Sequence, residues 1–292
     1  RIQCEMAEMQ KATCKALGFT CGMFVVNVVF FLSNIDSQRR PCVLEFVSVT
    51  SRSEPGWKTV SFHVGDLDVL APGPQFHSQV GQDQTIAMLF KELPGPRFFV
   101  DLAANDAQSL SNTLALERDF GWDGLLIEAN PQYYWRLAHR RAHVVAAAIG
   151  SPTNTVVEFA LKGLFGGIID KEFDNHEAKK EDRQQYSTVS IGDVLERYNA
   201  PTTIDYFSLD VEGAESMVML SFPFDRYRIL TLTVERPKAD LEALLESSGM
   251  IYVGDHGRFG DRLYIHQSFP NLAEVLPSLK QRMAALKEQK AH

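Results

Sequence analysis

Two acidic residues end neighbouring apolar runs in this 292-residue sequence, and their spacing is typical of a nucleotide site. Asp101 closes the run at residues 98–100, and Asn105 and Asp106 follow after two alanines. Glu128 ends the next apolar run, roughly 20 residues further on, where an acidic strand end of a βαβ unit accepts hydrogen bonds from ribose hydroxyls. Small side chains let a ligand approach the backbone, and N–H groups at a helix start face it. The two carboxylates therefore predict an adenosine-type ligand.

Three further carboxylates, Asp210, Glu212 and Glu215, lie close together in the run S-L-D-V-E-G-A-E. This run ends an apolar segment and opens a helical one, which places it at the carboxyl edge of a parallel sheet, where ligands bind. Crowded carboxylates raise one another's pKa, which suits a general base for a hydroxyl group or a divalent-ion site. Since no histidine or asparagine partner for a metal is identifiable, we predict Asp210 and Glu212 as catalytic residues and no metal. Glu212 and Glu215 have the alternative role of complementing a helix dipole.

His256 is the other acid–base candidate, because it lies between Gly254 and Gly257 in a predicted turn and imidazole titrates near neutral pH. An exposed loop histidine with no part in catalysis is the alternative. The sequence has no G-x-S-x-G elbow and no Walker A loop. Its four cysteines all lie within residues 1–42, and their spacing matches no zinc signature. Neither a nucleophilic serine nor a zinc ion is therefore predicted.

Alternating apolar strands and amphipathic helices must position these residues. The order predicted for residues 98–149 is strand, helix, strand, helix, strand, which is the βαβαβ half of a doubly wound α/β sheet. A second half repeats the alternation and ends in an antiparallel pair, and a charged stretch at residues 170–185 is predicted as a loop. The predicted helices lie at residues 78–93, 107–120, 132–141, 190–198, 214–220, 238–248 and 271–290, and the strands at residues 98–101, 124–128, 144–149, 156–161, 204–210, 229–235, 251–253 and 263–265.

The chain divides into a main domain and two flanking parts. A cluster of prolines and a glycine at residues 71–74 marks the start of the main domain. Before it, residues 43–70 predict a β-hairpin, and the uncharged residues 16–32 have the length of a short membrane span. A buried strand or helix is the alternative for residues 16–32, so a cytoplasmic and a membrane-anchored location both stay open. The predicted domains are residues 1–74, 75–270 and 271–292, the last an amphipathic helix.

The charge of the chain bears on its partners. The formal net charge is −8 at pH 7. A general affinity for nucleic acid needs clustered lysine and arginine side chains that replace counterions. We therefore predict a small or neutral substrate and no nucleic-acid partner.

Residues 78–268 resemble the FkbM-type S-adenosylmethionine-dependent methyltransferases. Six segments carry the resemblance, in the order and with the spacing of that family. They are SQVGQD (78–83), FFVDLAAND (98–106), GWDGLLIEANP (121–131), IDYFSLDVEGAE (204–215), TVERP (233–237) and DRLYI (261–265). The resemblance implies a Rossmann-like seven-stranded methyltransferase sheet, mostly parallel, with an antiparallel C-terminal edge and helices on both faces. It also implies S-adenosylmethionine as the cofactor.

The resemblance assigns roles to single residues. The family carries glycines where this chain has Ala103 and Ala107. Because alanine takes a positive φ less readily than glycine, we expect a turn built from ordinary backbone angles. The residues that the resemblance places at the cofactor are Gln82, Asp101, Ala103, Asn105, Asp106, Glu128, Ala148 and Asp210.

These inferences lead to an O-methyltransferase that acts on a hydroxyl group of a small molecule or sugar. Because the methyl donor is already activated, such an enzyme chiefly aligns the acceptor oxygen and removes its proton. A non-catalytic, membrane-tethered adaptor that keeps the methyltransferase fold is the alternative. An NAD-dependent oxidoreductase is disfavoured, since the turn after residue 101 lacks G-x-G-x-x-G.

Overall fold

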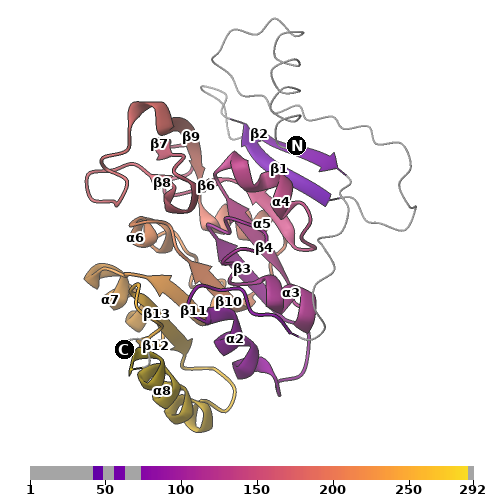
Figure 1. The fold of residues 1–292 in the computed structure, drawn as a ribbon, viewed down its shortest axis with the longest axis vertical. Helices are drawn as coiled ribbons and strands as arrows, with labels where there is room; N and C mark the ends of the chain where they lie inside the picture. Colours follow the sequence, from indigo (N-terminus) through magenta and orange to yellow (C-terminus); the bar gives the residue numbers. More distant parts are fainter. Residues whose placement is uncertain (1–41, 49–55, 63–73, 289–292) are drawn as a thin grey trace, which may run out of the picture. The chain divides into compact units, whose positions relative to one another are not determined.

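The computed structural model describes residues 42–48, 56–62 and 74–288 (Figure 1). The segment at residues 16–32, for which a membrane span was one of two predictions, lies outside the described residues. Among the described helices, none combines the length and the apolar character needed to cross a bilayer.

A nine-stranded sheet forms the centre of the described structure, in the order β12-β13-β11-β10-β3-β4-β5-β1-β2. Its middle strands are parallel to one another, whereas β13 is antiparallel to both β11 and β12. The stretch from β12 to β5 confirms the predicted seven-stranded α/β sheet. Its strands are β3 (Phe98–Leu102), β4 (Asp123–Glu128), β5 (His143–Ala146), β10 (Thr203–Leu209), β11 (Arg228–Glu235), β12 (Met250–Asp255) and β13 (Asp261–His266).

Two additional strands come from the hairpin predicted before the main domain. β1 (Cys42–Ser48) pairs with β2 (Gly56–Phe62) in antiparallel register, which confirms the hairpin. β1 also pairs with β5 in parallel register. The hairpin therefore extends the central sheet from seven strands to nine.

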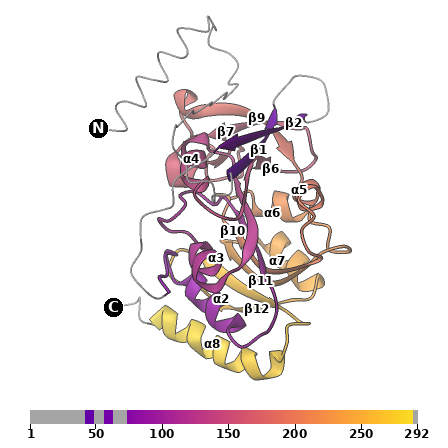
Figure 2. The same cartoon turned by 90° about the vertical axis from the view of Figure 1, so that its right-hand side faces the viewer.

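Helices cover both faces of the sheet (Figures 1 and 2). Successive side chains of a strand point to opposite faces, and in the middle strands both sets are buried. Phe99 belongs to the core cluster that includes residues of α2, α3 and α8, whereas Val100 belongs to the one that includes residues of α5, α6 and α7. The helices are α2 (Gln82–Phe90), α3 (Leu114–Phe120), α4 (Tyr134–Leu137), α5 (Ile191–Arg197), α6 (Glu215–Met219), α7 (Ala239–Ser247) and α8 (Leu272–Glu288).

Four predicted elements are shorter than expected, and the first is the helix predicted at residues 78–93, which is α2 at Gln82–Phe90. The helix predicted at residues 107–120 begins only at Leu114, because the Asp106 carboxylate accepts the N–H groups of Gln108 and Ser109 and so forms a competing turn. The helix predicted at residues 132–141 is a 3-10 turn, η1 (Pro131–Tyr133), followed by the short α4. The strand predicted at residues 144–149 breaks at Ala147 into β5 and β6 (Ala148–Ile149).

A second, four-stranded sheet stands beside the central one, in the order β6-β9-β7-β8. Its other strands are β7 (Val156–Ala160), β8 (Gly167–Ile168) and β9 (Arg183–Val189). The prediction of a loop throughout residues 170–185 is thus wrong at its end, where η3 (Lys180–Asp182) leads into β9. The strand was missed because residues 183–185 are polar and lack an apolar alternation.

Candidate active site

The carboxyl ends of β3, β4, β10 and β11 meet at one edge of the sheet, because these four strands are parallel neighbours. The chain leaves β3 on one side toward β4 and later returns on the other side as β10. Open α/β sheets bind ligands at such a reversal of strand order. The edge carries Glu128 at the end of β4, Asp210 just after β10 and Glu235 at the end of β11.

The turn after β3 contains two left-handed residues, Ala103 with φ 66° and Asn105 with φ 50°. The prediction of ordinary backbone angles is therefore wrong. Hydrogen bonds to the neighbouring strand hold the turn: the N–H groups of Ala103 and Ala104 both donate to the Ile127 carbonyl oxygen, at 2.9 and 3.1 Å. The Asn105 side chain donates in turn to the Ala103 carbonyl oxygen at 2.9 Å. These bonds offset the cost of left-handed backbone at residues that carry a Cβ.

Glu128 joins this turn to the segment that follows β4. Its carboxylate accepts the N–H of Asn105 at 2.8 Å and the N–H of Asn130 at 2.6 Å. Burial raises the pKa of Glu128 to about 7, and these backbone hydrogen bonds oppose the rise. Beside it, the side-chain nitrogen Nδ2 of the buried Asn130 has no hydrogen-bond partner within the part of the chain that the structure describes. An acceptor and an unused donor thus lie side by side, and a sugar hydroxyl can use both.

The carbonyl oxygen of the residue between them, Ala129, accepts two tyrosine hydroxyls. Tyr134 of α4 donates to it at 2.8 Å, and Tyr186 of β9 donates at 2.9 Å. Both tyrosines have a raised pKa because they are buried. The end of β4 is therefore tied to both the following helix and the second sheet.

Two of the predicted cofactor residues bind protein partners at this edge. Asp101 is buried and accepts the Thr113 hydroxyl at 2.6 Å, and burial raises its pKa. Asp106 holds the turn at residues 106–109 and forms an ion pair with Nε of Arg136 at 2.9 Å. Both carboxylates therefore stabilise the chain around the β3 turn through contacts within the protein. Their contact with a cofactor stays a prediction.

Three other predicted residues lie in buried surroundings. Gln82 donates to Asp261 at 2.9 Å from the start of α2. His256 is fully buried, with Nε2 2.9 Å from the Thr85 hydroxyl, so the alternative of an exposed loop histidine is wrong. Its role as a general base stays a prediction, and the observed contact ties it to α2. Ala148 of β6 packs in a small apolar cluster that includes Ala129.

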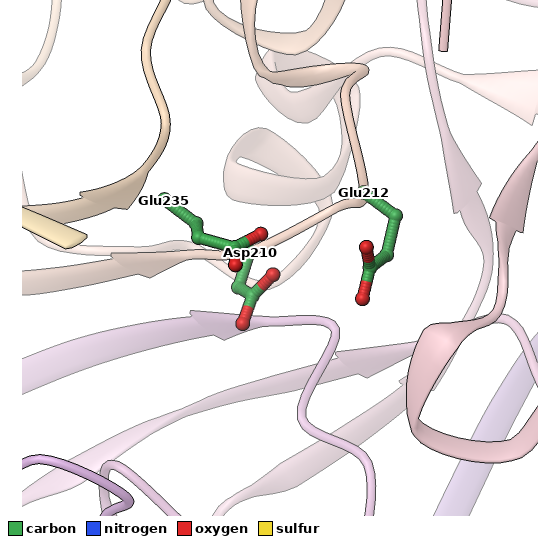
Figure 3. Close-up of side chains that lie close together, drawn as sticks. All are labelled: Asp210, Glu212 and Glu235. Atoms are coloured by element: carbon green, nitrogen blue, oxygen red, sulfur yellow. The ribbon is translucent and has the colours of Figure 1, made fainter. Parts of the chain in front are cut away.

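An acidic cluster forms at the ends of β10 and β11 (Figure 3). Carboxylate oxygens of Asp210, Glu212 and Glu235 lie within 4.8 Å of one another. Glu215, predicted as the third member, instead accepts the N–H groups of Val211 and Gly213, both at 3.1 Å. Glu235 takes its place because β11 lies directly beside β10 in parallel register. The sequence signal for Glu235 was the T-V-E-R-P segment at residues 233–237. Only the strand order shows that Glu235 lies beside Asp210.

The charges in this cluster are only partly compensated. Burial, then Glu235 and Glu212, hold the pKa of Asp210 well above its usual range, and Asp210 Oδ1 has no hydrogen-bond partner among the described residues. Burial and Glu235 raise the pKa of Glu212 to about 7. Nη2 of Arg236 pairs with Glu235 at 2.6 Å and with Glu212 at 3.2 Å. The cluster can take up a proton near neutral pH, and its oxygens are also close enough for a cation to bridge, so the absence of a metal stays a prediction.

The strand order defines an α/β protein with a doubly wound sheet, and polar side chains gather at the carboxyl edge of that sheet. The family model of the methyltransferase FkbM domain matches residues 101–258, which is more than half of the chain. The chain therefore belongs to the FkbM methyltransferase family, as the six sequence segments predicted, and the family implies a Rossmann-like fold. Comparisons with curated proteins and with solved structures found no match.

Proposed function

We propose that this protein is an S-adenosylmethionine-dependent O-methyltransferase whose acceptor is a hydroxyl group of a small molecule or sugar. Membership of the FkbM family supports methyl transfer. The observation that carries the proposal is the contact between Glu128 and the β3 turn at the carboxyl edge of the sheet. When bound, S-adenosylmethionine supplies an activated methyl group, so this chain has only to orient the acceptor and remove its proton.

The residues at the β3 turn fit an adenosyl group. Glu128 and Asn130 would hold the ribose hydroxyls, because they offer an acceptor and a buried donor without a protein partner among the described residues. Ala103 and Asn105 would present backbone to the cofactor, since their left-handed conformation turns the chain sharply after β3. A carboxylate and an amide are the side chains expected to discriminate hydroxyls from phosphate at this position.

The acidic cluster is the proposed proton acceptor. Asp210 is the member whose buried oxygen lacks a hydrogen-bond partner within the described segments, and its raised pKa makes its ionised form a stronger base than an ordinary aspartate. Glu212 and Glu235 would share the proton after its removal, because all three carboxylates lie within reach of one another. The negative charge here would repel a phosphate backbone, so nucleic acid is not among the proposed acceptors.

Binding of S-adenosylhomocysteine, the demethylated product, tests the proposal without knowledge of the acceptor. Calorimetry and thermal unfolding of the wild-type protein should show saturable binding and a higher melting temperature. Glu128→Gln should bind about tenfold more weakly or worse, as expected for the loss of a hydrogen bond to a charged group. Asp123→Asn is the matched control, because Asp123 is exposed at the opposite end of the same strand.

The outcomes separate the competing functions. NAD should neither bind nor stabilise the protein, whereas binding of NAD in preference to S-adenosylhomocysteine would favour an oxidoreductase. No heat and no thermal shift with S-adenosylmethionine or its product would refute the proposal and leave the non-catalytic adaptor. Equal weakening by Asp123→Asn and Glu128→Gln would remove Glu128 from the cofactor site.

A further inference from the structure

The segment between β8 and η3 is fastened to the end of β11 by two basic side chains. Arg236 Nη2 lies 2.7 Å from Asp174 Oδ2. Lys238 Nζ donates to the Glu172 carbonyl oxygen at 2.8 Å and lies 5.6 Å from the centre of the Phe173 ring. Residues far apart in the sequence thus hold residues 172–174, which we call the wall segment, beside the acidic cluster.

The wall segment also touches the backbone that carries the cluster. The Asp174 N–H donates to the Glu212 carbonyl oxygen at 3.2 Å. Gly213, the residue after Glu212, has a φ of 98°. A Cβ on Gly213 would lie 3.1 Å from both Phe173 Cα and the Asp174 nitrogen. Two stretches of backbone therefore meet so closely here that only glycine fits without a shift. The wall segment borders the turn between β10 and α6.

Arg236 itself is held in an uncommon conformation. Its φ is 40°, in the left-handed region that residues with a Cβ rarely adopt. Its N–H donates to the Gly260 carbonyl oxygen at 3.0 Å, and a Cβ on Gly260 would lie 2.6 Å from Arg236 Cγ. Backbone strain of this kind persists where the surroundings fix a residue from several sides, and it is concentrated at functional sites.

We propose that Arg236 is a positioning residue, whose single guanidinium binds Asp174, Glu212 and Glu235 and so fixes the wall segment against the acidic cluster. The role of the wall as a boundary of the acceptor site rests on the proposed function, whereas the fastening itself does not. Without Arg236, Asp174 faces Glu212 and Glu235 without the cation that pairs with all three carboxylates, and attraction becomes repulsion. The wall segment then opens.

Limited digestion with trypsin measures this opening directly, because Lys171 is exposed at one end of the wall segment and Lys179 and Lys180 lie beyond its other end. Cleavage of a briefly opened segment follows the population of the open form. In Arg236→Gln the initial rate at Lys171 should rise about tenfold, and Arg236→Lys should restore part of the protection, since it keeps the charge but not the guanidinium geometry. Arg226→Gln should match the wild type, because Arg226 forms an exposed ion pair with Glu196 before the start of β11.

Two further measurements keep the test decisive. Asp174→Asn removes the other half of the contact and should also raise cleavage at Lys171, which covers the case in which Arg236→Gln fails to fold. Unchanged cleavage in Arg236→Gln and Asp174→Asn, with thermal stability equal to the wild type, would overturn the proposal, and so would equal cleavage in Arg236→Gln and Arg226→Gln. Failure of the wild type to bind S-adenosylhomocysteine would refute the proposed function while leaving this digestion result intact.

Discussion

Replacement of Arg140 by methionine should destabilise the protein far more than replacement of a surface arginine. The Arg140 side chain is 1% exposed, and its Nε lies 3.1 Å from Oε2 of Glu117, whose side chain is 6% exposed. The guanidinium also donates to the Ala107 carbonyl oxygen and to the hydroxyl groups of Ser111 and Thr113. Methionine is similarly long but donates to none of these acceptors. The buried Glu117 carboxylate would then lose its ion-pair partner.

The magnitude follows from that burial. Breaking a buried ion pair by removing one partner costs about 3–5 kcal/mol. Since the whole folding free energy of a domain is about 5–15 kcal/mol, Arg140→Met should lose a large share of it. The matched control is Arg226→Met, because Arg226 pairs with Glu196 at 3.3 Å with side-chain exposures of 52% and 68%. An exposed pair of this kind contributes about 1 kcal/mol or less.

Urea unfolding followed by far-ultraviolet circular dichroism measures both variants, and similar slopes would show that the two unfolding transitions are comparable. A free-energy difference of less than about 1 kcal/mol between Arg140→Met and Arg226→Met would refute the reasoning. The double variant Glu117→Leu/Arg140→Met should recover part of the loss, because it removes the buried Glu117 carboxylate together with its cation. A double variant as unstable as the sum of the two single changes would show that packing, not charge, dominates.

Backbone geometry, titration and packing give three more measurable outcomes. Since the folded state holds the pKa of Glu128 at about 7 against an ordinary value of 4.5, it binds the extra proton between these pH values, so stability should fall as pH rises from 4.5 to 7. Glu128→Gln should flatten this part of the stability–pH curve, and an unchanged slope would contradict the assignment. Ala103→Gly should change the unfolding free energy by about 0–1 kcal/mol in the stabilising direction, because relief of left-handed strain outweighs the added chain entropy; a loss of more than about 1 kcal/mol would contradict that account. Gly124→Ala should cost about 1–3 kcal/mol or more in urea unfolding, because its Cβ would lie 2.5 Å from the Phe99 ring, and an unshifted midpoint would contradict the packing.

The central sheet could be predicted because its strands are buried on both faces. A strand that is buried on both faces is a continuous apolar run, such as residues 98–100, and turn residues mark both of its ends. β9 could not be predicted, since its first residues are polar and none of them is buried, and the strand is fixed by pairing with β7. The helix start at Leu114 was missed because Asp106 offers its own carboxylate to the backbone ahead of the helix.

Site residues could be predicted only where their position follows from spacing along the chain. Glu128 was identified from its distance to the β3 turn along the chain, which one βαβ unit fixes. Glu235 was not, because its contact with Asp210 depends on which strands become neighbours in the finished sheet. The left-handed conformation of Ala103 was predicted wrongly, since it is set by hydrogen bonds to Ile127 of the adjacent strand and not by its own side chain.

The shared acceptor at Ala129 has a mechanical consequence. A carbonyl oxygen has two lone pairs, and here one phenol from α4 and another from β9 use both. Neither element can shift away from the end of β4 without giving up its hydrogen bond, so α4 and β9 are both tied to the strand that ends in Glu128. Chemical nitration of either tyrosine would weaken its hydrogen bond to Ala129 and so would alter the position of Glu128, the preceding residue.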